Sequence, residues 1–163
     1  MSARRKTTSK PDRSIVVGTD GSPSATAAVR RAVSLARAEG ARLHIVTAYD
    51  PAITASRRKV MDAMPEELAW KASPGQEAED VAAAAAGIAA ADGIDVESHA
   101  EPGDPASVLV ELADKVHADL LVVGNKGMHG AGRILNSVPN KVSHHATCDV
   151  LIVDTTHDTH RAA

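Results

Sequence analysis

Two turns in this sequence carry residue types that could hold a phosphate group. The first, GTDGSPS, follows an apolar strand that we predict over residues 14–19, and it places Asp20 just before a glycine. The second, GNKGMHGAG, begins at Gly124 after the apolar run Leu120–Val123 and leads to a helical pattern after Ser137. Glycine lets a backbone approach a phosphate closely, and free amides at a helix start point towards an anion. This order of strand, glycine loop and helix N-terminus predicts a nucleotide or another phosphate site.

Apolar strand patterns alternate with helical patterns along the whole chain. Strands are expected at residues 14–19, 42–48, 94–99, 120–123 and 150–153. Helices are expected at residues 24–39, 76–91, 105–117 and 138–146, with Pro23 near the first helix start and Gly40 just past its end. Residues 50–73 are expected to be irregular, with MDAMPEELAW as a candidate short helix.

This alternation predicts a doubly wound α/β fold with a five-stranded parallel sheet and helices on both faces. In such sheets, ligands bind beyond the carboxyl ends of the strands, where the direction of winding reverses. We expect the strand order 3-2-1-4-5, which makes the first and fourth strands neighbours. The two polar turns then face each other across a crevice.

Length and composition indicate one globular domain. The chain has 163 residues, of which 44% are hydrophobic, and it contains no phenylalanine. Trp70 and Tyr49 are its aromatic residues, so the interior must consist of aliphatic side chains, which suits a parallel sheet under alanine-rich helices. We expect residues 14–154 to form the domain, a basic N-terminal tail at 1–13 and a flexible C-terminal tail at 155–163.

Several classes of protein lack their signals here. A net charge of −3 argues against a nucleic-acid partner. No segment reaches the length of a membrane span or follows the pattern of a signal peptide, so no membrane partner is expected. A single cysteine, Cys148, excludes an internal disulfide framework, and we expect a cytoplasmic location. Neither a Walker sequence nor a GxGxxG sequence is present, which argues against a P-loop NTPase and a dinucleotide oxidoreductase.

The histidines are numerous but scattered. His144 and His145 fall on the last predicted helix, whereas His157 and His160 fall in the C-terminal tail, near Asp154 and Asp158. Nothing in the sequence pre-organises the tail residues around an ion. We therefore predict only adventitious binding there and no metal site.

Three segments resemble the universal stress protein family, together covering residues 14–153. They are IVVGTDGSPSATAAVRRA, GDPASVLVELADKVHADLLVVG, and the glycine loop through SVPNKVSHHATCDVLIV. The nucleotide-binding branch of that family shows Gly, two residues, Gly, nine residues, and then Gly followed by Ser or Thr. Gly124 and Gly127 match the first two positions, and Asn136 with Ser137 replaces the last pair after eight residues. The loop is thus one residue shorter than the family pattern, and Asn136 is the residue best able to replace glycine at a positive φ.

The resemblance implies an adenine nucleotide between the two turns. Asp20 would lie near the adenine and ribose, although capping of the following turn is an equally ordinary use of aspartate. The backbone at Ala48 or Thr47 would meet the adenine ring, and Ser137 would both cap a helix and reach a phosphate. The implied nucleotide-binding residues are Gly18, Thr19, Asp20, Ala48, Gly124, Gly127, Met128, Gly130, Arg133, Asn136, Ser137 and Val138.

The leading hypothesis for function is an ATP-binding sensor or regulator in a stress response. Mg²⁺ or Mn²⁺ would accompany ATP, and hydrolysis would be weak at most because no general base for phosphoryl transfer is apparent. Cyclic AMP is an alternative ligand, since some family members bind it and a shorter loop suits a single phosphate. A second alternative is a dimeric interaction protein that binds no nucleotide. The resemblance also implies a homodimer that pairs through Val150–Val153.

Overall fold

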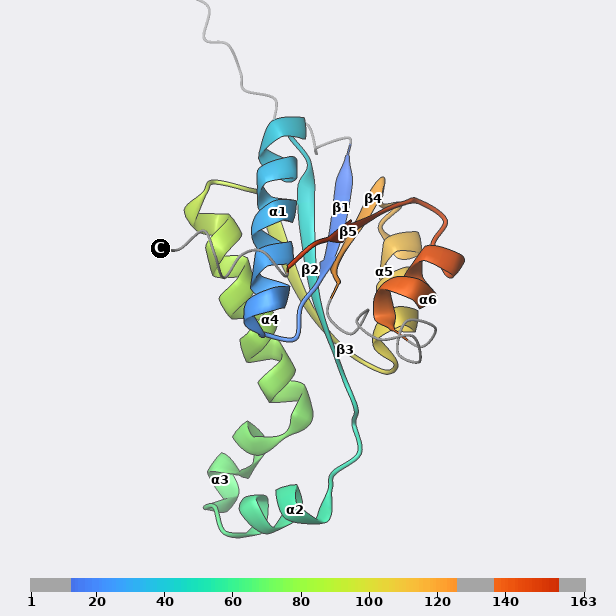
Figure 1. Cartoon of the computed structure of the whole chain (residues 1–163). Helices are drawn as coiled ribbons and strands as arrows, with labels where there is room; N and C mark the ends of the chain where they lie inside the picture. The colour runs from blue at the N-terminus through green and yellow to red at the C-terminus, as the bar shows by residue number, and fades with distance from the viewer. Residues whose placement is uncertain (1–12, 126–136, 156–163) are drawn as a thin grey trace, which may run out of the picture.

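The computed structural model describes residues 13–125 and 137–155. Five strands form one parallel sheet in the order β3-β2-β1-β4-β5 (Figure 1). The predicted doubly wound α/β fold and its strand order are therefore confirmed. The strands are β1 Ser14–Gly18, β2 Arg42–Tyr49, β3 Val96–Pro102, β4 Leu120–Gly124 and β5 Asp149–Val153.

Helices cover both faces of the sheet. Two of them, α1 and α4, lie on one face, and α5 and α6 lie on the other (Figure 1). Their bounds are α1 Pro23–Glu39, α4 Pro74–Ala91, α5 Pro105–Lys115 and α6 Val138–His145. Along β1, Ile15 and Val17 pack towards α1 and α4, whereas Val16 packs towards α5 and α6. The central strand is consequently buried on both sides, as its unbroken apolar run predicts.

The core is built from aliphatic side chains, and alanine lets the helices approach the sheet. Ala28, Ala32 and Ala36 of α1 recur every fourth residue and are fully or almost fully buried. The larger core side chains come from the strands, with Ile15 and Leu43 among those that are completely buried. In the described part of the chain, no helix has both the length and the apolar character to cross a membrane.

Local sequence signals explain where α1 begins and ends. Ser22 is its N-cap, and the Ser22 hydroxyl oxygen accepts a hydrogen bond from the Ala25 amide at 3.2 Å. Pro23 occupies the first turn, where the missing N–H costs little. Gly40 terminates the helix at φ +64°, a left-handed conformation that favours glycine. Both ends match the prediction.

Residues 50–73, which we call the arm, project away from the sheet (Figure 1). The arm contains α2 Ala55–Asp62, α3 Glu66–Ala69 and a short 3-10 turn, η1, at Trp70–Ala72. The expectation of an irregular segment was therefore wrong, although α3 lies within the candidate short helix MDAMPEELAW. Thr54 caps α2 by accepting a hydrogen bond from the Arg57 amide at 3.2 Å. Pro65, which has no N–H to continue a helix, separates α2 from α3 and splits the candidate helix MDAMPEELAW.

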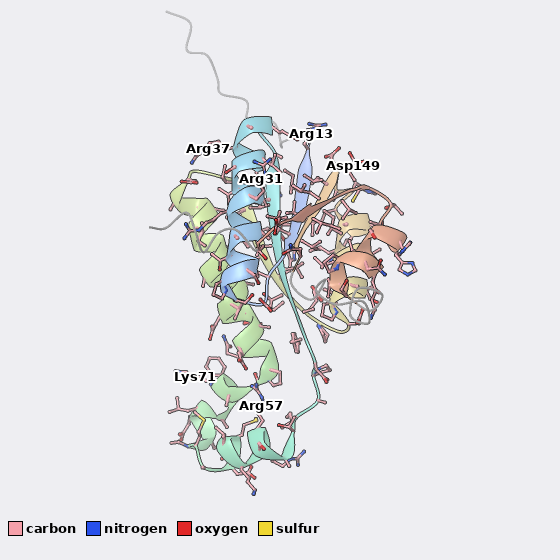
Figure 2. The ribbon with its side chains drawn as sticks, in the orientation of Figure 1. Arg13, Arg31, Arg37, Arg57, Lys71 and Asp149 are labelled. Carbon is pink, nitrogen blue, oxygen red and sulfur yellow. The ribbon has the colours of Figure 1, made fainter. Side chains whose placement is uncertain are left out.

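One arginine ties the arm to the body. The Arg57 guanidinium donates to the carbonyl of Ala72 at 2.8 Å and to the carboxylate of Glu77 at 2.7 Å. Glu77 lies in the first turn of α4, so α2 is linked to the start of that helix. Figure 2 shows Arg57 and Lys71 together in the arm, at the opposite end of the molecule from Arg13 and Arg37.

The third strand is displaced from its predicted position. The prediction was residues 94–99, whereas β3 spans Val96–Pro102. The Ile94 amide donates to the carbonyl of Ala89 at 3.1 Å, so Ile94 belongs to the turn that ends α4. At its other end, β3 stays paired with β2 as far as Tyr49 and Pro102. The remaining predicted elements agree with the structure to within about two residues at each end, the usual uncertainty of helix ends.

Candidate functional site

The first and fourth strands are neighbours, and this strand order indicates where a candidate site should lie. β1 pairs with β2 on one side and with β4 on the other, so the direction of winding reverses between β1 and β4. Ligands of doubly wound sheets bind at this position, beyond the carboxyl ends of the strands. A cavity of about 190 Å³, which we call the crevice, lies there. Its described lining residues are Gly18, Thr19, Asp20, Ser22, Ser24, Ala25, Val46, Ala48, Pro105, Val108, Leu109, Val123, Gly124, Val138 and Pro139.

Several residues that the sequence singled out meet in the crevice. Those that line it are Gly18, Thr19, Asp20, Ala48, Gly124 and Val138. Ser137 precedes Val138 directly, is buried, and caps α6 by accepting a hydrogen bond from the Asn140 amide at 3.4 Å. The other predicted residues lie outside the described part of the chain, and they are Gly127, Met128, Gly130, Arg133 and Asn136. The shortened loop that these residues define is likewise outside the described residues.

The turn after β1 is held by its own side chains. Asp20 accepts a hydrogen bond from the Ser22 amide at 2.9 Å, and Thr19 accepts one from the Gly21 amide at 3.1 Å. The Thr19 amide donates to the carbonyl of Val46 at 2.9 Å, which fastens the turn to β2. The turn-capping use of Asp20 is thus present in the structure, and Asp20 also lines the crevice. Of the two candidate residues at the end of β2, Ala48 lines the crevice.

The turn after β4 packs closely against the start of α1. A Cβ atom added at Gly124 would lie 3.3 Å from Thr155 Cγ2 and 3.4 Å from the backbone oxygen of Ser24. The distance to Thr155 is tighter than most side-chain contacts and that to Ser24 borders on ordinary van der Waals contact, so a side chain at Gly124 would press on Thr155. Gly124 therefore lets the β4 turn and the first turn of α1 share one wall of the crevice.

Three helix N-termini converge on the crevice. Residues of the first turns of α1, α5 and α6 all line it, because each of these helices follows the carboxyl end of a parallel strand. The positive ends of the helix dipoles consequently point towards one region, which favours an anion. Lys141 and Asp104 join the starts of α6 and α5 through a 3.4 Å ion pair. A hydrogen bond from the Ser107 amide holds the pKa of Asp104 below its ordinary value, with a smaller contribution from Lys141.

The sequence reasoning missed the contribution of α5. Pro105, Val108 and Leu109 supply much of the apolar wall of the crevice, opposite the start of α1. A usable signal was present, because parallel topology brings the start of every crossover helix to the same edge of the sheet. Which residues of α5 face the crevice, however, depends on how that helix packs over β1 and β2, and the sequence does not show this.

A second and larger cavity, of about 810 Å³, lies on the other side of α1. It opens between the arm and the helices α1 and α4, and arm residues such as Arg57 and Lys71 line it. Thr19 borders both cavities. Among the described residues that line the crevice, none comes from the arm. Despite its smaller volume, the crevice is the stronger candidate site, because Gly18, Gly124 and the converging helix starts line it.

Comparison with known proteins identifies the family. The sequence model of the universal stress protein family matches residues 13–154. The chain belongs to this family. Among curated universal stress proteins, Rv1636 of Mycobacterium tuberculosis is 42% identical over 145 residues, which cover 88% of this chain and 97% of that protein. A putative universal stress protein of Staphylococcus aureus is 35% identical over 146 residues, covering 88% and 84% respectively.

Solved structures agree with this assignment. One universal stress protein, whose structure was determined in complex with cAMP, is 40% identical and superimposes with a TM-score of 0.67. The match covers 88% of this chain and 98% of that one. The similarity therefore spans the sheet, the crevice and the helices that surround it.

Proposed function

We propose that this universal stress protein binds an adenine nucleotide in the crevice, in first place ATP with Mg²⁺ or Mn²⁺, and acts as a sensor or regulator in a stress response. One observation carries the proposal: the Gly18–Asp20 turn and Gly124 meet at the switch point, where three helix starts converge. Glycine backbones and helix N-termini favour phosphate oxygens. The apolar wall from Val46, Leu109 and Val123 suits a purine ring.

Charge suggests how the nucleotide is oriented. Asp20 is the one ionisable side chain among the described residues that line the crevice. A carboxylate accepts hydrogen bonds from ribose hydroxyls but repels phosphates, so the nucleoside belongs beside Asp20 and the phosphates belong beside Gly124 and Ser137. A bound Mg²⁺ would need few protein ligands, because it keeps several waters and is usually bound by substrate phosphates with one or two carboxylates. Because a single carboxylate offers no paired acid and base, the proposal includes at most weak ATP hydrolysis.

Cyclic AMP is a second candidate ligand. It is favoured by one specific observation, the 40% identity to a universal stress protein that was crystallised with cAMP. Cyclic AMP carries a single phosphate charge and needs fewer donors from the β4 turn than a triphosphate does. ATP and cyclic AMP would place the same adenosine group in the crevice. They would differ in the number of hydrogen-bond donors that their phosphates need near Gly124.

We expect a homodimer through β5 whichever nucleotide binds. A homodimer that binds no nucleotide is the remaining alternative for the function of this protein. β5 lies at an edge of the sheet, and Ile152 is 36% exposed on it. An apolar edge strand invites pairing with a second copy. We expect a dimer in light scattering at micromolar concentration and a shift to monomer in Ile152→Lys. A monomeric wild-type protein would remove this part of the proposal.

Ligand-dependent unfolding tests the proposal directly. The protein, freed of any bound nucleotide, is unfolded thermally with ATP and Mg²⁺, with cyclic AMP, with GTP and Mg²⁺, and with Mg²⁺ alone. At a ligand concentration one hundred times the Kd, stabilisation is about 2.7 kcal/mol. Stabilisation by ATP but not by GTP supports an ATP regulator, and stabilisation by cyclic AMP alone supports the second candidate. No stabilisation by either adenine nucleotide refutes nucleotide binding and leaves the interaction protein.

A further inference from the structure

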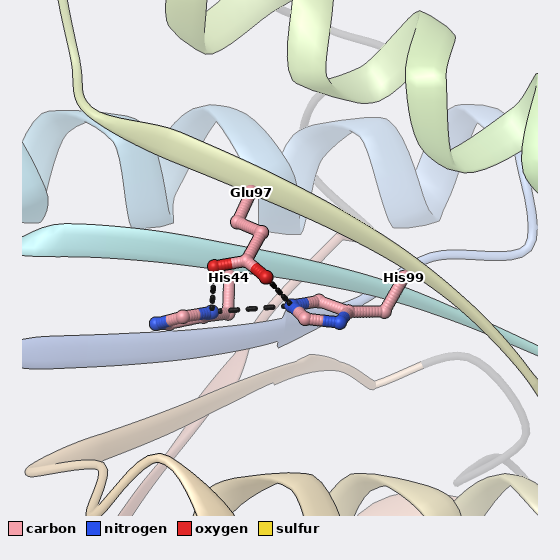
Figure 3. Close-up of side chains that lie close together, drawn as sticks. All are labelled: His44, Glu97 and His99. Carbon is pink, nitrogen blue, oxygen red and sulfur yellow. Dashed lines mark hydrogen bonds and ion pairs between the residues drawn. The ribbon is translucent and has the colours of Figure 1, made fainter.

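Three potential metal ligands from β2 and β3 come together outside the crevice. They are His44, Glu97 and His99, and their ligand atoms all lie within 4.8 Å of one another. His44 Nδ1 is 3.2 Å from His99 Nε2. One carboxylate oxygen of Glu97 is 3.8 Å from His44 Nδ1, and the other is 3.9 Å from His99 Nε2. Figure 3 shows the carboxylate facing both imidazole rings, with one oxygen directed to each.

The sheet register fixes this arrangement. His44 of β2 is paired directly with Glu97 of β3, so the two side chains lie across from each other. His99 follows Glu97 by two residues and therefore projects from the same face of β3. The backbone of a regular parallel pair thus holds all three side chains in place before any ion binds. Pre-organisation of this kind is what the C-terminal tail histidines lack.

Burial differs among the three residues in a way that suits ion entry. His44 is 4% exposed, whereas the side chain of Glu97 is 54% exposed. The two imidazoles form the inner part of the cluster, and the carboxylate lies at its solvent side. Burial, followed by the neighbouring His99, lowers the pKa of His44. Metal coordination uses the neutral form of an imidazole ring.

Distances and donor types favour a transition-metal ion such as Zn²⁺. Zn²⁺ binds imidazole nitrogen at about 2.0–2.1 Å in tetrahedral geometry, which sets neighbouring ligand atoms about 3.3 Å apart. The imidazole nitrogens already satisfy this spacing, and the half-exposed Glu97 needs only a small side-chain movement to complete it. Two imidazoles with one carboxylate suit Zn²⁺ and related transition-metal ions, whereas Mg²⁺ and Ca²⁺ prefer oxygen ligands throughout.

We propose that His44, Glu97 and His99 form a zinc-binding site that joins the edge strand β3 to β2. The three protein ligands leave a fourth position for water, and each ligand comes from a rigid strand rather than from a loop. The site differs from any Mg²⁺ that enters with ATP, because neither histidine lines the crevice. It nevertheless adjoins the crevice, since His99 is paired with Val46, which does line it.

The test is a zinc titration of the full-length, nucleotide-free protein in competition with a chromophoric chelator. We expect one tightly bound zinc per chain, a higher unfolding temperature with zinc, and no effect of Mg²⁺ at the same concentration. Substitution by Co²⁺ is expected to give the intense visible absorption of a four-coordinate site. Absence of saturable zinc binding by the wild-type protein would overturn the proposal.

Variants decide where the ion binds. Glu97→Gln and His99→Asn change the two more accessible ligands, which avoids the risk of unfolding that a change at buried His44 brings. Removal of a residue that only hydrogen-bonds to a metal ligand typically weakens metal binding by about 10- to 100-fold. Each of these variants removes a ligand itself and is expected to weaken zinc binding by more than that. Their unfolding midpoints without zinc are measured first, so that lost binding in a folded protein is unambiguous.

The tail histidines provide the matched control. The double variant His157→Ala/His160→Ala removes the two histidines of the C-terminal tail and leaves the strands untouched. It is expected to bind one zinc with wild-type affinity. Loss of zinc binding in this variant, or undiminished binding in both strand variants, would assign the ion to adventitious sites and overturn the proposal.

Discussion

The side chain of Asn125 forms hydrogen bonds with both the backbone amide and the side-chain hydroxyl of Thr155. Its side-chain oxygen accepts a hydrogen bond from the Thr155 amide at 3.1 Å and another from the Thr155 hydroxyl at 2.7 Å. Its side-chain nitrogen donates to Asp154 at 2.9 Å. The residue after Gly124 is thereby fastened to the chain just beyond β5. One amide side chain thus couples the wall of the crevice to the edge strand that we propose as the dimer contact.

The first prediction concerns this clamp. Asn125→Ala removes both acceptor interactions with Thr155 and should lower the free energy of unfolding by about 1–2 kcal/mol. Urea denaturation measures the loss. Thr155→Val removes only the hydroxyl interaction and keeps the backbone one, so it should cost less. An equal or larger loss in Thr155→Val would contradict the account of the clamp.

The second prediction compares two glycines, one expected to affect nucleotide affinity and the other expected to affect only stability. Gly124→Ala places a methyl group against Thr155 and Ser24, and we expect the wall of the crevice to shift and nucleotide affinity to fall about tenfold, or about 1.4 kcal/mol. Gly40→Ala is the control, because its strain arises from φ +64° and no atom lies within 4 Å of the added Cβ. It should lower stability by about 1–2 kcal/mol and leave nucleotide affinity unchanged in calorimetry.

The third prediction compares two serine N-caps. Ser137 caps α6 at the crevice, and Ser73 caps α4 by accepting a hydrogen bond from the Gln76 amide at 3.2 Å. Replacement of either by alanine should cost about 1 kcal/mol of stability. Only Ser137→Ala should also weaken nucleotide binding, since Ser137 directly precedes Val138 and Pro139 in the wall of the crevice, whereas Ser73 and its neighbours in the chain are not part of that wall. Equal affinities of the two variants, measured by calorimetry, would show that Ser137 serves the helix alone.

The fourth prediction concerns a buried hydroxyl. Within the described residues, the Thr47 hydroxyl is buried and has no hydrogen-bond partner. Thr47→Val keeps the shape and removes the unsatisfied group, so the free energy of unfolding should rise by about 1 kcal/mol. Thr19→Val is the contrasting variant, because the Thr19 hydroxyl accepts a hydrogen bond from Gly21 and its loss should destabilise the protein. Chemical denaturation of both variants should therefore give changes of opposite sign.

The fifth prediction is a pH dependence at the single cysteine. Burial raises the pKa of Cys148, and the carboxylates of Asp114 and Asp149 raise it further. Alkylation by iodoacetamide at neutral pH should therefore be slower than for an unstructured cysteine and should accelerate only at alkaline pH. Because the folded pKa lies above the unfolded one, the associated stability is present at neutral pH and is lost as the pH rises. Asp149→Asn should lower the pKa that the alkylation rate reports.

The sequence predicted the sheet well because its strands are short apolar runs bounded by glycine, proline and polar residues. It failed in the arm, since α2 is polar overall, has no buried residue and therefore offers few apolar residues that would mark a helix. The start of β3 was misplaced because Ile94 is apolar, as a strand residue would be, yet hydrogen-bonds to the end of α4.

The crevice and the histidine cluster differ in how far sequence could reveal them. Asp20 and Gly124 were found because each belongs to a turn whose composition is informative by itself. His44 and His99 are 55 residues apart, and only the pairing register of β2 with β3 brings them together. Strand order can be inferred from topology rules, but register at a solvent-exposed edge depends on packing that no local pattern encodes.

The lack of aromatic side chains in the core has an optical consequence. Trp70 is 53% exposed in the arm, and Tyr49 ends β2 where the arm begins. Intrinsic fluorescence therefore reports the surroundings of the arm, and near-ultraviolet circular dichroism carries little signal from the packed sheet. A ligand in the cavity lined by Lys71 and Ala72 should change the tryptophan emission, whereas occupancy of the crevice should leave it almost unchanged. Emission spectra can thus tell the two cavities apart without any label.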